Sequence, residues 1–159
     1  MTSQASATIL IVDDEASVRS GLARSLHDPC YRILQAASPA EALSILEGEQ
    51  VDVVITDFMM PGMSGLELLA LVRERFPDTS RIMLTGHASV QIAVRAIKEG
   101  EIYRFLAKPC DQTELQVTVH LALEQLRLSR EHRRLLEVVS TRPELARAVE
   151  EARRQARQD

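Results

Sequence analysis

Short apolar runs alternate along the chain with segments whose apolar residues recur at helical spacing. The runs are residues 8–12, 31–37, 51–56, 81–85 and 102–107. Several of them are almost continuously apolar, which is typical of strands in a parallel sheet with both faces covered. Five strands therefore alternate with five helices, and the pattern predicts an open, doubly wound α/β sandwich.

Local signals mark where some of these helices begin and end. Ser38 and Pro39 are good residues for the start of a helix, and Glu41 follows Ser38 by three positions. The last helix is expected to begin at about Asp111 and to continue well beyond the last strand. The chain is therefore one α/β domain followed by a helical extension.

Polar residues stand where four of the predicted strands end. In such sheets ligands bind outside the carboxyl ends of the strands, so these positions are candidates for a functional site. The first strand is followed by Asp13 and Asp14, the third by Asp57, the fourth ends in Thr85, and Lys108 follows the fifth. We expect all five side chains to meet at one edge of the sheet.

Three carboxylates at one edge repel one another unless a cation lies between them. Mg²⁺ suits such a site, because it prefers oxygen ligands and usually binds one or two carboxylates together with phosphate oxygens. Asp14 and Asp57 are expected to bind it directly, and Asp13 through water. Lys108 offers a positive charge and Thr85 a hydroxyl donor for phosphate oxygens.

This set of groups favours phosphoryl transfer, with the carboxylate of Asp57 as the nucleophile. Each residue also has a purely structural interpretation. Asp14 is a suitable helix N-cap, and an acid or a Lys-Pro pair after a strand often belongs only to a turn. The coincidence of all five positions at the functional edge of one sheet favours the chemical interpretation.

Composition narrows the class of protein. Of the 159 residues 45% are hydrophobic, 26% are charged and 3% are aromatic, and the net charge is −4, which argues against general binding to nucleic acid or to anionic membranes. Cys30 and Cys110 lack the spacing of a zinc site or of a disulfide framework. The absence of an apolar membrane span or a signal peptide predicts a cytoplasmic protein.

From about Thr8 to Leu126 the chain resembles the receiver domain of bacterial two-component response regulators. The resemblance is carried by the motifs VDDE, DFMMPGMSG, LTGHAS and FLAKP. It implies a flavodoxin-like sheet with strand order 2-1-3-4-5 and a histidine kinase as phosphodonor. It also implies a signalling module that catalyses only its own phosphorylation and dephosphorylation.

The same resemblance assigns roles to particular residues. Asp57 is the implied phosphoacceptor; Asp14, Asp57 and the carbonyl of Met59 would bind Mg²⁺ or Mn²⁺, with Asp13 supporting the metal through water. Thr85 and Lys108 are the implied partners of the phosphoryl group.

The resemblance further implies a conformational switch formed by Thr85 and Phe105, although Phe105 is equally well explained as a core residue. Met59 and His87 occupy the positions that tune hydrolysis, and His87 either orients water or simply faces solvent. Because Met59 cannot hydrogen bond to water, we expect a persistent phosphoaspartate.

Residues 127–159 extend beyond the expected receiver domain of residues 1–126. Leu121, Leu128 and Leu135 alternate with Gln125, His132 and Val139 at heptad spacing, which indicates a parallel coiled-coil dimer or a signalling helix. A solvated helix leading into a linker is the alternative. The pattern from Thr141 to Glu144 predicts a capping box that restarts a helix.

The extension holds nine arginines and six acidic residues, a mixture better explained by a solvated helix surface than by a DNA-reading element. A complete output domain is not recognisable in it. Residues 100–128 resemble, with less specific motifs, receivers that are fused to a downstream effector, often a cyclic-dinucleotide phosphodiesterase of the HD type.

Three rival functions fit the sequence less well. A haloacid dehalogenase-type enzyme needs a second acid two residues after its nucleophile, and Met59 stands there instead. A nucleotide- or flavin-binding module needs a glycine-rich, positive loop after the first strand, whereas this chain has VDDEAS. A receiver-like module that binds partners without being phosphorylated would not need all five site residues.

Overall fold

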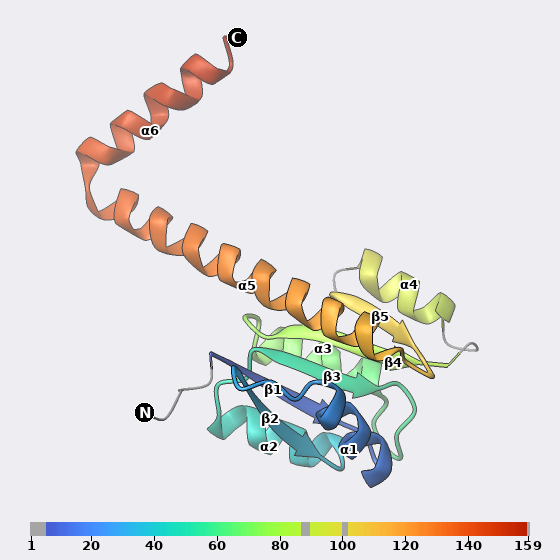
Figure 1. The fold of residues 1–159 in the computed structure, drawn as a ribbon. Coiled ribbons are helices and arrows are strands. Elements are labelled where there is room, and N and C mark those ends of the chain that lie inside the picture. Colours follow the sequence, from blue (N-terminus) through green and yellow to red (C-terminus); the bar gives the residue numbers. More distant parts are fainter. Residues whose placement is uncertain (1–5, 87–89, 100–101, 159) are drawn as a thin grey trace. The chain divides into compact units, whose positions relative to one another are not determined.

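The protein is described by a computed structural model covering residues 6–86, 90–99 and 102–158 (Figure 1). Strands and helices alternate from the start of the chain. The elements are β1 (Ala7–Val12), α1 (Ala16–Ser25), β2 (Tyr31–Ala36), α2 (Pro39–Gly48), β3 (Val53–Asp57), α3 (Gly65–Arg75), β4 (Ser80–Thr85), α4 (Val90–Lys98), β5 (Arg104–Ala107), α5 (Gln112–Thr141) and α6 (Pro143–Ala156).

The five strands form one parallel sheet with the order β2-β1-β3-β4-β5. The predicted fold class and strand order are thereby confirmed. The order reverses between β1 and β3, so the loops that follow these two strands lie side by side at the carboxyl edge of the sheet.

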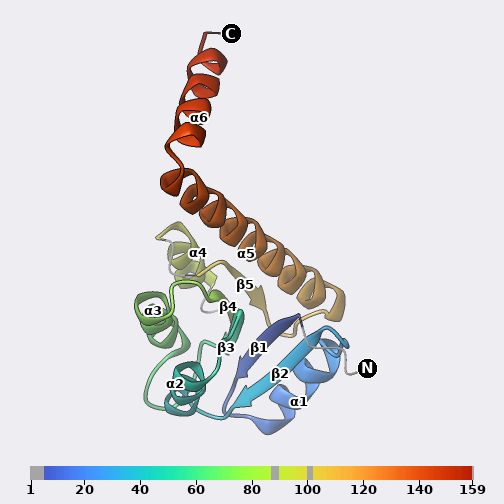
Figure 2. The ribbon, with the colours of Figure 1, turned by 90° about the vertical axis from the view of Figure 1, so that its left-hand side faces the viewer.

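Helices cover both faces of the sheet. Figure 2 shows α1 and the first part of α5 on one face and α2, α3 and α4 on the other. A large core cluster joins alternate residues of the central strands, such as Leu10, Val54 and Met83, to Leu68 of α3 and Ala93 of α4. The opposite side chains of the strands are buried as well, which explains why their sequences are continuously apolar.

Each strand begins or ends one or two residues away from its apolar run, and the differences at β3 and β5 are informative. β3 extends through Asp57, so the acidic residue belongs to the buried strand itself. The last apolar run begins at Ile102, whereas β5 itself starts at Arg104. Ile102 is apolar because it is buried in the core cluster, although it does not belong to the strand. Burial and strand pairing have different causes, and hydropathy reports only the first.

The C-terminal region is helical, as expected, but one detail of the prediction was wrong. Thr141 is the last residue of α5, and α6 begins at Pro143 with Arg142 as its N-cap and without a side-chain capping bond. The hydroxyl of Thr141 instead donates to the carbonyl of Val138 in its own helix. The predicted capping box therefore does not form, and the break follows from Pro143, which cannot donate a helical hydrogen bond.

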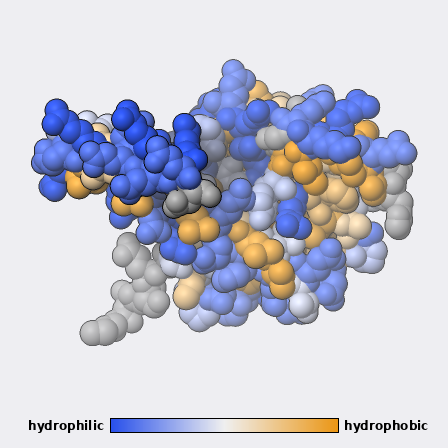
Figure 3. Space-filling view, turned by 90° about the horizontal axis from the view of Figure 1, so that it is seen from above, coloured by the Kyte–Doolittle hydropathy of each residue, from blue (hydrophilic) through white to orange (hydrophobic). Residues whose placement is uncertain are grey.

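By the density of backbone contacts the chain divides into two compact units, residues 1–124 and residues 125–159. The second unit comprises the rest of α5 and α6, and its residues are mostly exposed. In the view of Figure 3, hydrophilic side chains dominate the surface and hydrophobic ones gather in smaller patches. Among the helices that the structure describes, each is too short or too polar to cross a bilayer.

Candidate functional site

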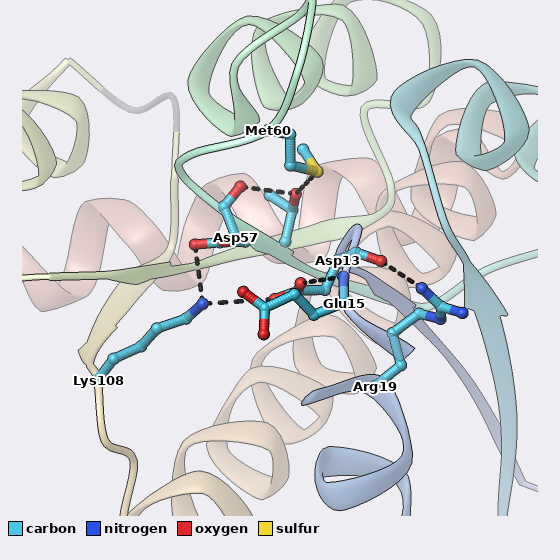
Figure 4. Close-up of polar contacts among 7 residues, drawn as sticks. Asp13, Glu15, Arg19, Asp57, Met60 and Lys108 are labelled. Carbon is cyan, nitrogen blue, oxygen red and sulfur yellow. Dashed lines mark hydrogen bonds and ion pairs between the residues drawn. The ribbon is translucent and has the colours of Figure 1, made fainter. Parts of the chain in front are cut away.

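Asp57 ends the most buried strand of the sheet. All five residues of β3 are buried, and Asp57 is 9% exposed, at the open end of the strand. The hydroxyl of Thr56 donates to the carbonyl oxygen of Asp57 at 3.1 Å and contacts the sulfur of Met60 at 4.0 Å (Figure 4). The backbone below the carboxylate is thus held in place, while the carboxylate itself faces the edge of the sheet.

The loop after Asp57 returns closely to the same backbone. Gly62 adopts a left-handed conformation with φ of 83°, which favours glycine. Gly65, the first residue of α3, donates its N–H to the carbonyl of Phe58 at 2.9 Å. A Cβ atom on Gly65 would lie 2.0 Å from the carbonyl oxygen of Asp57, so only glycine allows this approach.

Ser64 anchors the same loop to α3. Its hydroxyl accepts a hydrogen bond from the N–H of Glu67, and the Glu67 carboxylate accepts one from the N–H of Ser64, which completes a capping box. Neither this box nor the role of Gly65 was predicted. The Ser-x-x-Glu pattern was a readable signal for the box, but no local pattern reports the contact of Gly65 with Asp57.

Asp13 and Asp14 follow β1, next to the end of β3. Asp13 is 1% exposed, and its Oδ1 accepts a hydrogen bond of 2.9 Å from the N–H of Glu15. Asp14 is exposed. Carboxylate oxygens of Asp13, Asp14 and Asp57 all lie within 4.8 Å of one another, so the three acids can share one metal ion. Asp14 is not the N-cap of α1; that position is Glu15.

Lys108, which follows β5, completes the cluster. Its ammonium lies 3.1 Å from Oδ1 of Asp57 and 3.4 Å from Oδ2 of Asp13 (Figure 4). Partial burial lowers the pKa of Lys108, but hydrogen bonding and the charges of Asp57 and Asp13 outweigh this effect and leave the pKa above its usual value. The lysine is therefore fully charged at neutral pH.

Thr85 lies at the end of β4, and its carbonyl accepts a hydrogen bond of 2.9 Å from the N–H of Lys108. Its side chain is buried, and the hydroxyl donates to the carbonyl of Gly86 at 3.1 Å. Thr85 and Lys108 are thus connected through the backbone. Their side chains have different partners: the hydroxyl of Thr85 contacts Gly86, whereas the ammonium of Lys108 contacts Asp57 and Asp13.

The remaining predicted residues lie around this cluster. Phe105 is partly buried and packs against the large core cluster, which is compatible both with a core residue and with a movable one. Met59 is 71% exposed. His87 lies outside the described residues.

The arrangement suits an oxygen-seeking cation and a phosphoryl group. Three carboxylates and one ammonium give the cluster a formal net charge of −2. A divalent cation neutralises that excess and leaves coordination positions for phosphate oxygens. Lys108 stands where it can contact a group attached to Asp57.

Comparison with known proteins agrees with this geometry. Residues 9–120 match the model of the response regulator receiver domain family. The hydrogenase transcriptional regulatory protein HoxA of Cupriavidus necator is 36% identical over 140 residues, which cover 87% of this chain and 29% of that protein. The transcriptional regulatory protein GlrR of Escherichia coli is 35% identical over 153 residues, covering 96% and 34%.

A solved structure agrees as well. The signal receiver domain of an HD domain-containing protein from Pseudomonas fluorescens superimposes with a TM-score of 0.74 at 37% identity, covering 82% of this chain and 96% of that one. The chain spans about a third of the length of the curated relatives HoxA and GlrR.

Proposed function

The chain belongs to the response regulator receiver domain family, and from this premise we propose that Asp57 accepts a phosphoryl group from the phosphohistidine of a sensor histidine kinase. Membership makes this domain a phosphoacceptor module of two-component signalling, in contrast to a domain that turns over an external substrate. The observation that carries the assignment to Asp57 is the ion pair with Lys108, 3.1 Å from its Oδ1. A cytoplasmic location belongs to the same proposal.

In the proposed transfer, a carboxylate oxygen of Asp57 attacks the phosphorus atom, the N–P bond of the phosphohistidine breaks, and an O–P bond forms. Lys108 stays protonated and offsets the charge of the phosphoryl oxygens. The hydroxyl of Thr85, which donates to the carbonyl of Gly86 in the present state, would turn to donate to a phosphoryl oxygen. Phe105 would follow this movement into the space beside Thr85.

We assign the metal site to Asp14, Asp57 and the carbonyl of Met59, with Asp13 acting through water. The close approach of the three carboxylates supports the assignment, since separate acids of this kind repel unless a cation is shared. Mg²⁺, or Mn²⁺ in its place, would supply electrostatic stabilisation of the transferring phosphoryl group when bound.

Met59 and His87 would set the lifetime of the phosphoaspartate. Met59 is exposed beside Asp57 and carries no group that orients water. We therefore expect slow hydrolysis, and a half-life of only a few seconds for the magnesium-bound phosphoprotein at neutral pH would contradict this.

For the output we propose control of a downstream effector. An HD-type phosphodiesterase is one candidate, favoured by the similarity to the receiver of an HD domain-containing protein. A transcriptional output is the other, because HoxA and GlrR are named as transcriptional regulatory proteins. We treat residues 127–159 as the helical linker to such an effector and expect no direct contact with nucleic acid or membrane.

We also propose that a second copy of this chain packs in parallel along α5. Leu121, Leu128 and Leu135 repeat every seven residues and are 42%, 56% and 59% exposed, which is high for leucine. In a parallel pair, Glu124 would face Ser129 of the partner helix across the heptad edge. An antiparallel pair that keeps all three leucines in contact would bring Glu124 or Glu131 close to a glutamate of the other copy and is less favourable.

The decisive experiment is intact-mass analysis after incubation with acetyl phosphate and Mg²⁺, for wild type and Asp57→Asn. One added phosphoryl group in the wild type and none in Asp57→Asn is the expected result. An unmodified wild type would refute phosphorylation and favour a module that acts only by binding partners. Steady release of phosphate from a simple phosphate ester would instead indicate a dehalogenase-type phosphatase.

A further inference from the structure

Arg19 of α1 makes a short hydrogen bond to the backbone of the acidic cluster. Its guanidinium donates to the carbonyl oxygen of Asp13 at 2.6 Å (Figure 4). The bond spans six residues and closes the turn that connects β1 to α1. Arg19 itself touches none of the three carboxylates in the described contacts, so any effect on them passes through the backbone of Asp13.

The turn between β1 and α1 has little other support from α1. The N-cap residue Glu15 makes no side-chain capping bond, and no residue of α1 is fully buried. In contrast, the serines that cap α2 and α3, Ser38 and Ser64, accept the hydrogen bonds expected of an N-cap. The far end of α1 is tied to α5 by the amide of Gln116, which donates to the carbonyl of Ser25.

The backbone of Asp13 determines where its carboxylate lies. Its N–H donates to the carbonyl of Ala36 at the end of β2, and its Oδ1 accepts from the N–H of Glu15 within the turn. The bond from Arg19 fixes the carbonyl that lies between these two points. If that carbonyl rotates, the peptide unit of Asp14 rotates with it, because the peptide bond is planar.

We propose that Arg19 is a positioning residue for the metal site, holding the Asp13–Asp14 turn in the geometry in which its carboxylates and that of Asp57 share a cation. This inference rests on the function proposed above. Groups that orient metal ligands from outside typically change metal affinity by about 10- to 100-fold when they are removed. The competing interpretation is that Arg19 only attaches α1 to the sheet.

Mn²⁺ binding to the full chain separates the two interpretations. The titration, followed by the electron paramagnetic resonance of free Mn²⁺, is carried out on wild type, Arg19→Met, Arg19→Lys and Arg24→Met. Arg19→Met keeps an unbranched apolar side chain and loses the donor. Arg24→Met makes the same change on the same helix, away from the turn. Circular dichroism and thermal unfolding in EDTA report folding without metal.

We expect Arg19→Met to bind Mn²⁺ about 10- to 100-fold more weakly than wild type, and Arg24→Met to stay within about two-fold. Arg19→Lys keeps the charge without the planar donor fork, and its Mn²⁺ affinity is expected to lie between those of Arg19→Met and Arg24→Met. A purely structural Arg19 would lower the unfolding temperature in EDTA but leave the Mn²⁺ affinity of the folded protein unchanged, which would overturn the proposal.

Two further outcomes of the titration lead to different conclusions. If Arg19→Met does not fold, Arg19→Lys decides, and an affinity equal to that of wild type would overturn the inference. If the wild type itself binds no Mn²⁺, the proposed metal site is wrong, whereas binding by wild type and Arg19→Met with equal affinity refutes only the role of Arg19.

Discussion

The ammonium of Lys108 lies 3.1 Å from Oδ1 of Asp57, although Asp57 ends β3, Lys108 follows β5, and β4 lies between these two strands in the sheet. A buried strand can end in a carboxylate because this cation stands at the same edge. Burial of an unpaired charge would cost several kcal/mol. The ion pair therefore connects the stability of the fold with the chemistry proposed for the site.

This ion pair predicts a pH dependence of stability. The pKa of Lys108 in the folded protein lies above its usual value of 10.5. The stabilisation is then fully present below about pH 10.5 and is lost as the pH rises through the folded pKa. The difference in unfolding free energy between wild type and Lys108→Met should be constant near neutral pH and shrink at higher pH.

Urea denaturation at a series of pH values measures that difference. Lys98→Met, which removes an exposed lysine of α4, serves as the control and should show no comparable decline. A difference for Lys108→Met that stays constant up to about pH 12, beyond the usual lysine range, would contradict the prediction.

Gly65→Ala is expected to destabilise the protein. The added Cβ would lie 2.0 Å from the carbonyl oxygen of Asp57, so the end of β3 or the start of α3 must shift. We expect a loss of about 3 kcal/mol in the free energy of unfolding, at the upper end of typical overpacking costs. Phosphorylation by acetyl phosphate should also slow, because Asp57 would be displaced.

The matched control for this substitution is Gly48→Ala at the end of α2. A Cβ atom added to Gly48 would meet no atom within 4 Å outside its chain neighbours and its own helix backbone, and its φ is not in the left-handed region. Alanine there should be neutral or stabilise by about 0.5 kcal/mol. Equal effects of the two substitutions in chemical denaturation would refute the importance of the contact with Asp57.

Metal binding should stabilise the fold through the acidic cluster. At about 100 times its dissociation constant, Mg²⁺ would add about 2.7 kcal/mol to the free energy of unfolding, and Asp14→Asn should abolish most of this gain. Asp14 is exposed, so its substitution is compatible with folding. Thermal unfolding with Mg²⁺ and with EDTA measures the effect.

Glu15→Gln is the control for Asp14→Asn, since it removes an exposed acid from the same loop that is not one of the three grouped carboxylates. It should retain most of the Mg²⁺-dependent stabilisation. Loss of the gain in both variants would indicate general charge screening and not a defined site.

The proposed association along α5 predicts that Leu128→Lys produces monomers. Lysine would place two charges in the apolar contact between the helices. Glu137→Lys introduces the same side chain at an exposed position that would face away from the partner and should leave the mass unchanged. Light scattering, with and without acetyl phosphate, gives the mass in solution; a monomeric wild type under both conditions would refute the dimer.

Much of the fold could be predicted because its causes are repetitive along the chain. The apolar runs reflect a sheet buried on both faces, and Ser38 with Pro39 marked the start of α2. The site followed from one geometric rule, since parallel strands bring their carboxyl ends together. That rule grouped Asp13, Asp57 and Lys108 before any distance was known.

Other features could not be predicted because they depend on atoms that are distant in the sequence or on exact directions. The hydroxyl of Thr85 donates to the carbonyl of Gly86, and strand position alone does not determine that rotation. The predicted cap at Thr141 failed because α5 continues through that residue up to the break before Pro143.

The sequence by itself determined the order of strands and helices, the buried positions and the set of groups at the sheet edge, because these follow from hydropathy, spacing and chain direction. Only the tertiary structure decided which groups touch. The contact of Gly65 with the Asp57 carbonyl and the bond from Arg19 to Asp13 depend on distances of a few ångströms after packing. A pattern of residue types does not contain such distances.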